Sequence, residues 1–135
     1  MANYLMDTNH AATLVTLGHP LRQKFARCLR LGDTFSIAVP VLAETLFGIG
    51  SLPRATQNLA EWTRLRSRLG CYSNDEIDAE NAANLQITLR RQGWQLETID
   101  AFIAVVAVRY DLVLLTSDND FRRIPNLNRD NWLVP

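Results

Sequence analysis

Short apolar runs alternate along the chain with segments whose apolar residues recur every three or four positions. The runs have the length and composition of buried strands. They cover residues 4–6, 36–41, 71–72, 112–115 and 132–134, the last as an edge strand. Because strands that alternate with helices form parallel sheets covered by helices on both faces, the pattern predicts an α/β fold. We expect a three-layer α/β/α sandwich around a mostly parallel central sheet.

The intervening helices have recognisable start and stop residues. Pro20 is suited to the first position of a helix that Gly32 ends. A second helix follows the strand at 36–41 and is interrupted by Gly48 and Gly50, and a third opens at Pro53.

Two further helices are expected in the second half of the chain. Ser73, with Glu76 three residues later, forms a predicted capping box for a helix that runs to Gly93. Thr98 is expected to cap the next helix, which is apolar on nearly every side. A helix of that composition is predicted to be buried.

Length and composition are those of one globular domain covering residues 1–135. The chain is 47% hydrophobic and 21% charged, which excludes disordered and fibrous classes. The longest apolar run, 101–108, is far shorter than the roughly 20 residues that cross a bilayer, and the start has no signal-peptide pattern. We therefore expect a soluble cytoplasmic protein without membrane contact, in which Cys28 and Cys71 are reduced, buried thiols.

The charge balance excludes only one way of binding nucleic acid. Fourteen basic residues balance fourteen acidic ones, so bulk positive charge is absent although a local patch is still allowed. Thirteen of the basic residues are Arg, and Lys24 is the exception. Arginine forks onto phosphate or carboxylate oxygens, whereas lysine acts as a point charge.

Acidic residues follow the predicted strands at the ends where ligands bind in α/β sheets. Asp7 ends the first strand, Glu44 lies about a turn after the second, and Asp118 follows the strand at 112–115. Asp100 lies in the first turn of the buried helix and joins them only if that helix starts at the same edge. The sequence leaves that point open.

Each acid also has a purely structural explanation. Asp favours strand ends and turns, and an acid in a first helical turn gains about 0.3–1 kcal/mol from the helix dipole. Asp118 and Asp120 are the most ambiguous pair. Glu44 and Asp100, however, lie within apolar stretches, where an unpaired carboxylate is costly.

Converging carboxylates need protons or a cation to offset their repulsion. Two of them about 5 Å apart repel by roughly 3 kcal/mol at an effective dielectric constant near 20. A purely oxygen-based ligand set favours Mg²⁺ or Mn²⁺ over zinc. Such an ion activates water and stabilises charge on a phosphoryl oxygen, so the predicted reaction is hydrolysis of a phosphodiester.

Four segments in order resemble the PIN-domain ribonucleases, and above all the VapC-type toxins of prokaryotic toxin–antitoxin pairs. They are MDTN at 6–9, LAETLFG at 42–48, TIDAFIA at 98–104 and LLTSDNDFRRIPNL at 114–127. The resemblance covers nearly the whole chain. It implies RNA cleavage that depends on Mg²⁺ or Mn²⁺, dimerisation to a homodimer, and inhibition by a cognate small antitoxin protein.

The resemblance also implies a set of site residues. Its catalytic acids map to Asp7, Glu44, Asp100 and Asp118, of which Asp7, Asp100 and Asp118 would hold the metal. Its supporting residues map to Thr8, Thr116 and Asp120. One departure concerns the TSDNDF segment, because many members have Asn after the last strand's Thr and an acid two residues later. We favour Asp118 over Asp120 as the ligand, since it is nearer the strand end.

Other polar and aromatic residues are given less direct roles. His10 is interpreted as a polar residue at a helix start rather than a general base. The tryptophans are expected to pack in the protein rather than stack on bases. The candidates for contacts with RNA phosphates are Arg90, Arg91, Arg122 and Arg123.

Two alternatives compete with the nuclease hypothesis. The first is a catalytically inactive PIN-like module that binds a partner, against which the complete acid set argues. The second is phosphotransfer to a small molecule through a nucleophilic Asp. That chemistry requires a second Asp two residues after the first, and here the position after Asp7 is Asn9.

Overall fold

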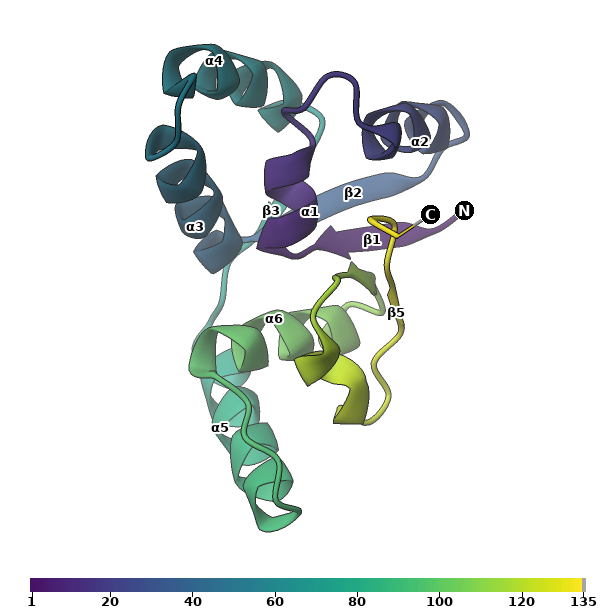
Figure 1. The fold of residues 1–135 in the computed structure, drawn as a ribbon. Coiled ribbons are helices and arrows are strands. Elements are labelled where there is room, and N and C mark those ends of the chain that lie inside the picture. Colours follow the sequence, from purple (N-terminus) through teal and green to yellow (C-terminus); the bar gives the residue numbers. More distant parts are fainter. Residues whose placement is uncertain (135) are drawn as a thin grey trace.

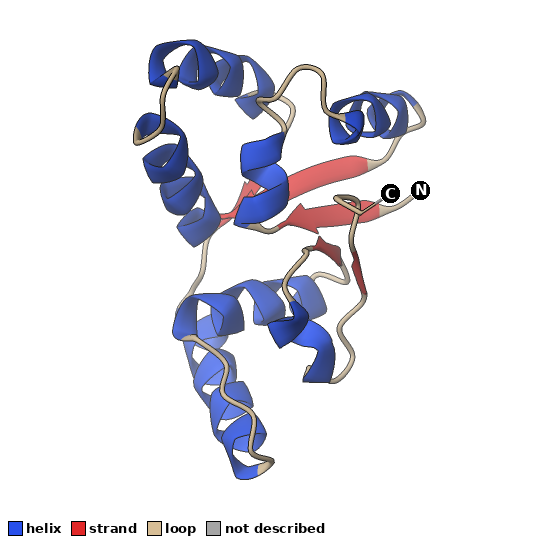
Figure 2. Cartoon of the chain, in the orientation of Figure 1, coloured by secondary structure: helices blue, strands red, loops and turns tan. Residues whose placement is uncertain are grey.

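The computed structural model describes residues 1–134 and confirms the predicted three-layer sandwich (Figure 1). The described strands are β1 (Asn3–Met6), β2 (Thr34–Ala38), β3 (Gly70–Tyr72), β4 (Val113–Leu115) and β5 (Arg129–Asp130). The helices are α1 (Thr8–Thr13), α2 (Pro20–Arg30), α3 (Val39–Gly50), α4 (Ala55–Arg66), α5 (Glu76–Arg91), α6 (Thr98–Arg109) and the 3₁₀ helix η1 (Asn119–Arg123). Figure 2 shows the sheet between α1 to α4 on one side and α5, α6 and η1 on the other.

The order of the strands determines where a ligand site can form. The strands lie in the order β3-β2-β1-β4-β5, and each neighbouring pair is parallel. After β1 the chain therefore adds β2 and β3 on one side and returns to place β4 on the other. The carboxyl ends of β1 and β4 flank this reversal, which is where α/β sheets form their binding crevice.

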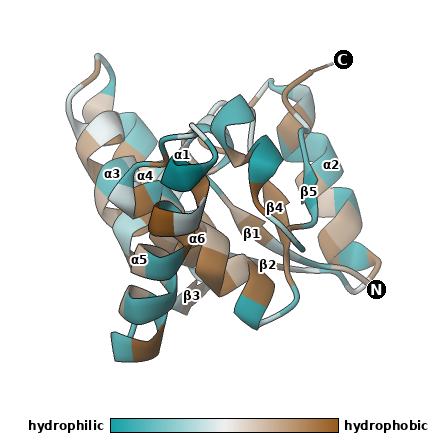
Figure 3. Ribbon diagram, turned by 90° about the horizontal axis from the view of Figure 1, so that it is seen from below, coloured by the Kyte–Doolittle hydropathy of each residue, from teal (hydrophilic) through white to brown (hydrophobic). Residues whose placement is uncertain are grey.

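Helix α6 is the buried helix that its composition predicted. Six of its twelve residues are buried, and the ribbon of α6 in Figure 3 is mainly in the brown of hydrophobic residues. Side chains such as Ile103 and Val106 are completely inaccessible, and each contributes about 1.5–3 kcal/mol by burial. This packing fixes α6 against the sheet and so fixes the position of its first turn. Within residues 1–134, no helix is both long and apolar enough to span a membrane.

Two prolines lie differently from the prediction. The strand expected at 36–41 is β2, which ends at Ala38, because Pro40 occupies the first turn of α3, where its missing N–H is harmless. Pro53 does not open the following helix. That helix, α4, begins at Ala55 after Arg54, whose positive φ of 65° turns the chain into it.

The caps of the last two long helices are also shifted along the chain. The capping box of α5 is formed by Asp75 and Asp78, not by Ser73 and Glu76. Arg109 of α6 pairs with both carboxylates, so a tertiary contact selects this box. Similarly, Thr98 is the first residue of α6 and Glu97 is its N-cap.

The C-terminal segment forms its strand earlier than expected. β5 pairs with β4 through Arg129 and Asp130, and residues 132–134 are not a strand. Trp132 instead turns inward, with its ring centroid 4.8 Å from Tyr4 and 5.7 Å from Phe35. Burial of this large ring decides the path of the chain after β5.

The two cysteines differ from their expectation in exposure. Both are free thiols, but Cys71 is exposed on β3 and Cys28 is half-buried on α2. The prediction of two buried thiols is therefore wrong, because Cys71 lies exposed on the edge strand β3 and Cys28 is only half-buried.

Candidate metal centre

Asp7 connects the end of β1 to the start of α1. It is the N-cap of α1, and its Oδ1 accepts a hydrogen bond from the Thr8 N–H at 2.8 Å. Its Oδ2 accepts another from the Thr116 hydroxyl, also at 2.8 Å. Burial raises the pKa of the Asp7 carboxyl, while these two hydrogen bonds act against the rise. The side chain is thus held in one orientation at the carboxyl end of β1.

Thr116 links the ends of the two neighbouring strands. Its hydroxyl donates to Asp7 and accepts from the Asp118 N–H at 3.0 Å. Asp118 is in turn the N-cap of η1, since its Oδ1 accepts from the Asp120 N–H at 2.9 Å. The turn after β4 is therefore shaped by its own side chains, which place Asp118 and Asp120 beside the end of β1.

Asp100 meets this turn from the first turn of α6. Three acids lie close together: Asp100, Asp118 and Asp120. Each has one carboxylate oxygen within 4.8 Å of a carboxylate oxygen of the other two. Burial raises the pKa of Asp100 to about 6, and the negative charges of Asp7, Asp118, Asp120 and Glu44 add to the rise. The first turn of α6 thus lies at the same sheet edge as the other acids. The sequence alone did not determine this position.

Glu44 is at the edge of the group rather than inside it. Its Oε1 accepts a hydrogen bond from the Thr8 hydroxyl at 3.2 Å. The expectation that its apolar surroundings in sequence bury it is wrong, because its side chain projects from the exposed side of α3. The apolar neighbours Leu46 and Phe47 are themselves partly exposed, at 41% and 77%.

The acids that the sequence singled out therefore converge, but the three that lie closest together are not the three predicted as metal ligands. Asp118 and Asp120 both belong to the cluster of three, so the choice between them is not exclusive. Asp7 lies outside that cluster of three, and both of its oxygens already accept hydrogen bonds. Its charge nevertheless acts on Asp100.

The donor chemistry fits a hard divalent cation. The clustered groups offer only carboxylate oxygens, which are the ligands that Mg²⁺ and Mn²⁺ prefer. Burial is the main cause of the raised pKa of Asp100, and repulsion by the neighbouring carboxylates adds to it. A positive ion would remove that repulsion, so the residues present fit such an ion.

Trp94 is a residue near the acids whose position the sequence did not reveal. Its indole N–H donates to the Asp120 carbonyl at 3.1 Å, and the guanidinium carbons of Arg122 and Arg123 lie 4.8 and 4.7 Å from its ring centroid. Trp94 thus supports η1 from the loop between α5 and α6. No sequence pattern signals this contact, since the partners are 26 residues apart.

The two predicted pairs of RNA-contacting arginines have different surroundings. Arg122 and Arg123 lie at the end of η1, directly after the acidic turn. Arg90 and Arg91 are in the last turn of α5, where Arg90 borders a shallow cavity of about 420 Å³ with Gln86 and Leu96.

His10 is buried in α1 and makes no contact with the clustered acids. Its Nε2 accepts from the Trp132 main-chain N–H at 3.0 Å, and its Nδ1 lies 2.7 Å from the Asn9 side-chain oxygen. Burial lowers the pKa of His10 to about 4. A neutral ring that donates from Nδ1 and accepts at Nε2 satisfies both bonds. His10 is therefore a buried structural residue of α1.

Comparison with known proteins gives results that agree with this geometry. The PIN domain matches residues 4–127 of the chain. Ribonuclease VapC2 of Rickettsia felis is 26% identical over 130 residues, which are 96% of this chain and 97% of the relative.

Similar solved structures come from complexes named VapBC. The crystal structure of VapBC2 from Rickettsia felis bound to a promoter DNA fragment contains a chain with a TM-score of 0.83 and 25% identity, covering 96% of this chain and 98% of that one. DNA-bound VapBC from Salmonella typhimurium gives a TM-score of 0.81 at 25% identity, covering 98% and 99%. Because the domain match spans most of the sequence and the fold agrees with these structures, the chain belongs to the PIN domain family.

Proposed function

We propose that this protein is a divalent-metal-dependent endoribonuclease that acts as the toxin of a toxin–antitoxin pair. The observation that carries the proposal is the gathering of carboxylates at the reversal between β1 and β4. Asp100, Asp118 and Asp120 lie together there, and the charges of Asp7 and Glu44 reach the same point. The relative named ribonuclease VapC2, similar along almost its whole length, supports RNA as the substrate.

We assign the metal to Asp100 and Asp118, assisted by Asp7 or Asp120, with Mg²⁺ or Mn²⁺ as the ion. When bound, such an ion lowers the pKa of water and stabilises negative charge on a phosphoryl oxygen. Thr8 and Thr116 orient the Asp7 carboxylate through their hydrogen bonds. Glu44, exposed at the edge of the acidic group, is our candidate to orient the attacking water.

We further propose a protein partner for this chain. The similar structures are complexes named VapBC, so the expected partner is a small antitoxin protein that inhibits the nuclease. Homodimerisation is proposed from the same resemblance. Arg90, Arg91, Arg122 and Arg123 remain candidates for contacts with RNA phosphates.

The decisive experiment compares RNA cleavage by the wild type and by Asp7→Asn. We expect cleavage of single-stranded RNA with Mn²⁺ or Mg²⁺ and none in EDTA. Asparagine preserves the N-cap of α1, so the variant should fold while losing activity by at least about a hundredfold.

The matched control is Asp111→Asn, an exposed position with φ of 54°, which asparagine adopts readily. This variant should cleave RNA as the wild type does. Undiminished metal-dependent cleavage by Asp7→Asn would contradict the proposal. Absence of both cleavage and Mn²⁺ binding in the wild type would favour an inactive partner-binding PIN module.

A further inference from the structure

The basic residues of this net-neutral protein are concentrated on two helices. Residues 20–30 and 54–68, which form α2 and α4 with their flanks, contain eight of the fourteen basic residues and a single acid, Glu61. The eight are Arg22, Lys24, Arg27, Arg30, Arg54, Arg64, Arg66 and Arg68. The rest of the chain is correspondingly acidic, so the molecule has a strongly positive region that its net charge conceals.

The two helices enclose a groove of about 590 Å³, which we call the arginine groove. Four arginines line it: Arg22, Arg30, Arg64 and Arg68. Phe25 and Leu65 are buried and also line the groove. Figure 1 places α2 and α4 on the same side of the sheet, beside α1.

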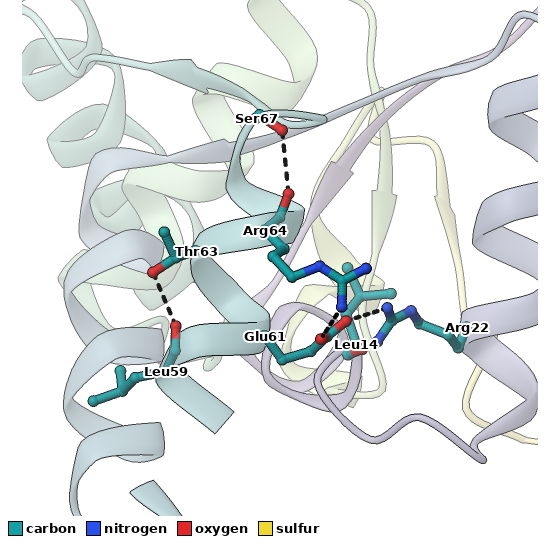
Figure 4. Close-up of polar contacts among 7 residues, drawn as sticks. All are labelled: Leu14, Arg22, Leu59, Glu61, Thr63, Arg64 and Ser67. Carbon is teal, nitrogen blue, oxygen red and sulfur yellow. Dashed lines mark hydrogen bonds and ion pairs between the residues drawn. The ribbon is translucent and has the colours of Figure 1, made fainter. Parts of the chain in front are cut away.

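Glu61 organises one part of the groove (Figure 4). It forms an ion pair with Arg22 and a second with Arg64 at 3.0 Å, and its side chain is only 12% exposed. Arg22 also donates from Nη1 to the Leu14 carbonyl at 2.8 Å. In the described part of the chain, the exposed Arg30 and Arg68 side chains form no hydrogen bond or ion pair, so their guanidinium groups are free for an external anion.

Helix α1 connects the arginine groove with the acidic centre. Asp7 caps its first turn, and Leu14, which binds Arg22, is the C-cap at its other end. At 1.5 Å per residue, the helix separates Asp7 from Leu14, at the Arg22 end of the groove, by about 10 Å. Successive phosphates of a stacked strand are about 3.4 Å apart along its axis, so roughly three nucleotides cover that distance.

An acidic cleavage site cannot supply the affinity for a polyanion. Asp7, Glu44, Asp100, Asp118 and Asp120 repel phosphates, and a bound divalent cation offsets only part of their charge. The binding free energy must therefore come from positive surface elsewhere, and the arginine groove, with its four lining arginines, provides such a surface. Arginine guanidinium groups can donate two parallel hydrogen bonds to the oxygens of one phosphate.

We infer that the arginine groove between α2 and α4 binds the phosphate backbone of the RNA substrate and leads the strand along α1 to the acidic centre. The inference rests on the proposed ribonuclease function. It adds an RNA-binding surface distinct from the arginines at 90–91 and 122–123. An acidic protein segment is the competing occupant, and the experiment separates the two.

The test measures binding of a fluorescein-labelled single-stranded RNA of about 20 nucleotides by anisotropy, in EDTA and over a range of salt. Each lost phosphate contact should weaken binding about fivefold at 0.1 M salt and reduce the slope of log K against log salt by about 0.7. Arg30→Gln/Arg68→Gln should thus raise the Kd about 25-fold and lower the slope by about 1.4.

The matched control is Arg129→Gln, which removes an exposed arginine from β5. It should change the Kd by less than about twofold and leave the slope unaltered. An unchanged slope in the double variant, or an equal loss per charge in the control, would overturn the inference. The urea midpoint of each variant should match that of the wild type, because the substituted side chains are exposed.

A labelled polyglutamate peptide separates the competing occupant. If the double variant loses affinity for polyglutamate while its affinity for RNA is unchanged, the groove serves an acidic protein segment and the inference is wrong. Because the assay contains no divalent cation, it is independent of cleavage. If the protein proves not to cleave RNA, the Kd values still test RNA binding by the groove. If the Kd of the double variant is unaltered, the cleavage assay still tests the proposed function.

Discussion

The acidic centre and the arginine groove lie at opposite ends of α1 and hold their charges in opposite ways. In the acidic centre, like charges are crowded and half-buried, so the pKa of Asp100 rises to about 6. In the groove, the arginines either pair with Glu61 or extend into solvent. Charge at the centre therefore lowers the stability of the metal-free fold, whereas charge on the groove is almost without cost. The first is suited to binding a cation, and the second to binding a polyanion.

The largest effect is expected from Asp100→Asn. RNA cleavage should fall by at least about a hundredfold, because a proposed metal ligand is lost. The metal-free variant should nevertheless be more stable at pH 7, by about 1 kcal/mol after allowance for partial exposure of the carboxylate. The reason is that the raised pKa of Asp100 makes its ionised form unfavourable in the folded state. Cleavage assays and urea unfolding in EDTA test both statements.

The pH dependence of this gain has a defined sign. The folded wild type binds a proton at Asp100 more tightly than the unfolded chain does, so its stability should rise as pH falls from about 6 towards 3.8. Asp100→Asn should lack that rise. A variant that is less stable than the wild type at pH 7 would show that burial of the Asp100 carboxylate among like charges does not destabilise the fold.

A pH effect of opposite sign is expected from His10, inside the helix that joins the two regions. Because the pKa of His10 falls from 6.5 to about 4, the unfolded chain gains a proton in this window that the folded chain does not. The free energy of unfolding should therefore decrease by up to about 1.4 kcal/mol for each unit by which the pH falls from 6.5 to about 4.

His10→Leu isolates this contribution. The variant should lose about 1–3 kcal/mol at pH 7, since the Trp132 N–H would lack its acceptor. Its unfolding free energy should also lose the downward slope between pH 6.5 and 4. Urea unfolding across this range measures both quantities, and an unaltered slope would contradict the account of His10.

The smallest effects separate the two kinds of arginine in the groove. Arg22→Gln should destabilise the fold by about 1–2 kcal/mol, because it removes the bond to Leu14 and one partner of the half-buried Glu61. Arg68→Gln should change stability by less than about 0.5 kcal/mol. Urea unfolding measures both. Equal losses would show that Glu61 does not organise the groove as described.

Most of the fold followed from local patterns, and the exceptions have identifiable physical causes. Pro20 starts α2 as predicted, since a proline at a helix start satisfies a local rule. The prediction places the capping box of α5 at Ser73, two residues before the observed Asp75. The reason is that Arg109, far along the chain, stabilises the pair Asp75 and Asp78. The final strand was misplaced because Trp132 packs into the core.

The candidate site divides in the same way. Asp7 and Asp118 were found from their positions after apolar runs, since strand ends in a parallel sheet meet at one edge. The role of Trp94 and the exposure of Glu44 were not foreseen, because both depend on how distant helices and loops pack.

The sequence by itself determined the alternation of strands and helices, the acids at the strand ends and the oxygen-only ligand chemistry. These depend on neighbours a few residues apart. The tertiary structure alone decided that α6 begins at the shared sheet edge and that α2 and α4 lie beside each other. Charge summed along a chain is independent of folding, but electrostatic interactions depend on distance in space. Only folding therefore divided a neutral sequence into an acidic centre and an arginine groove.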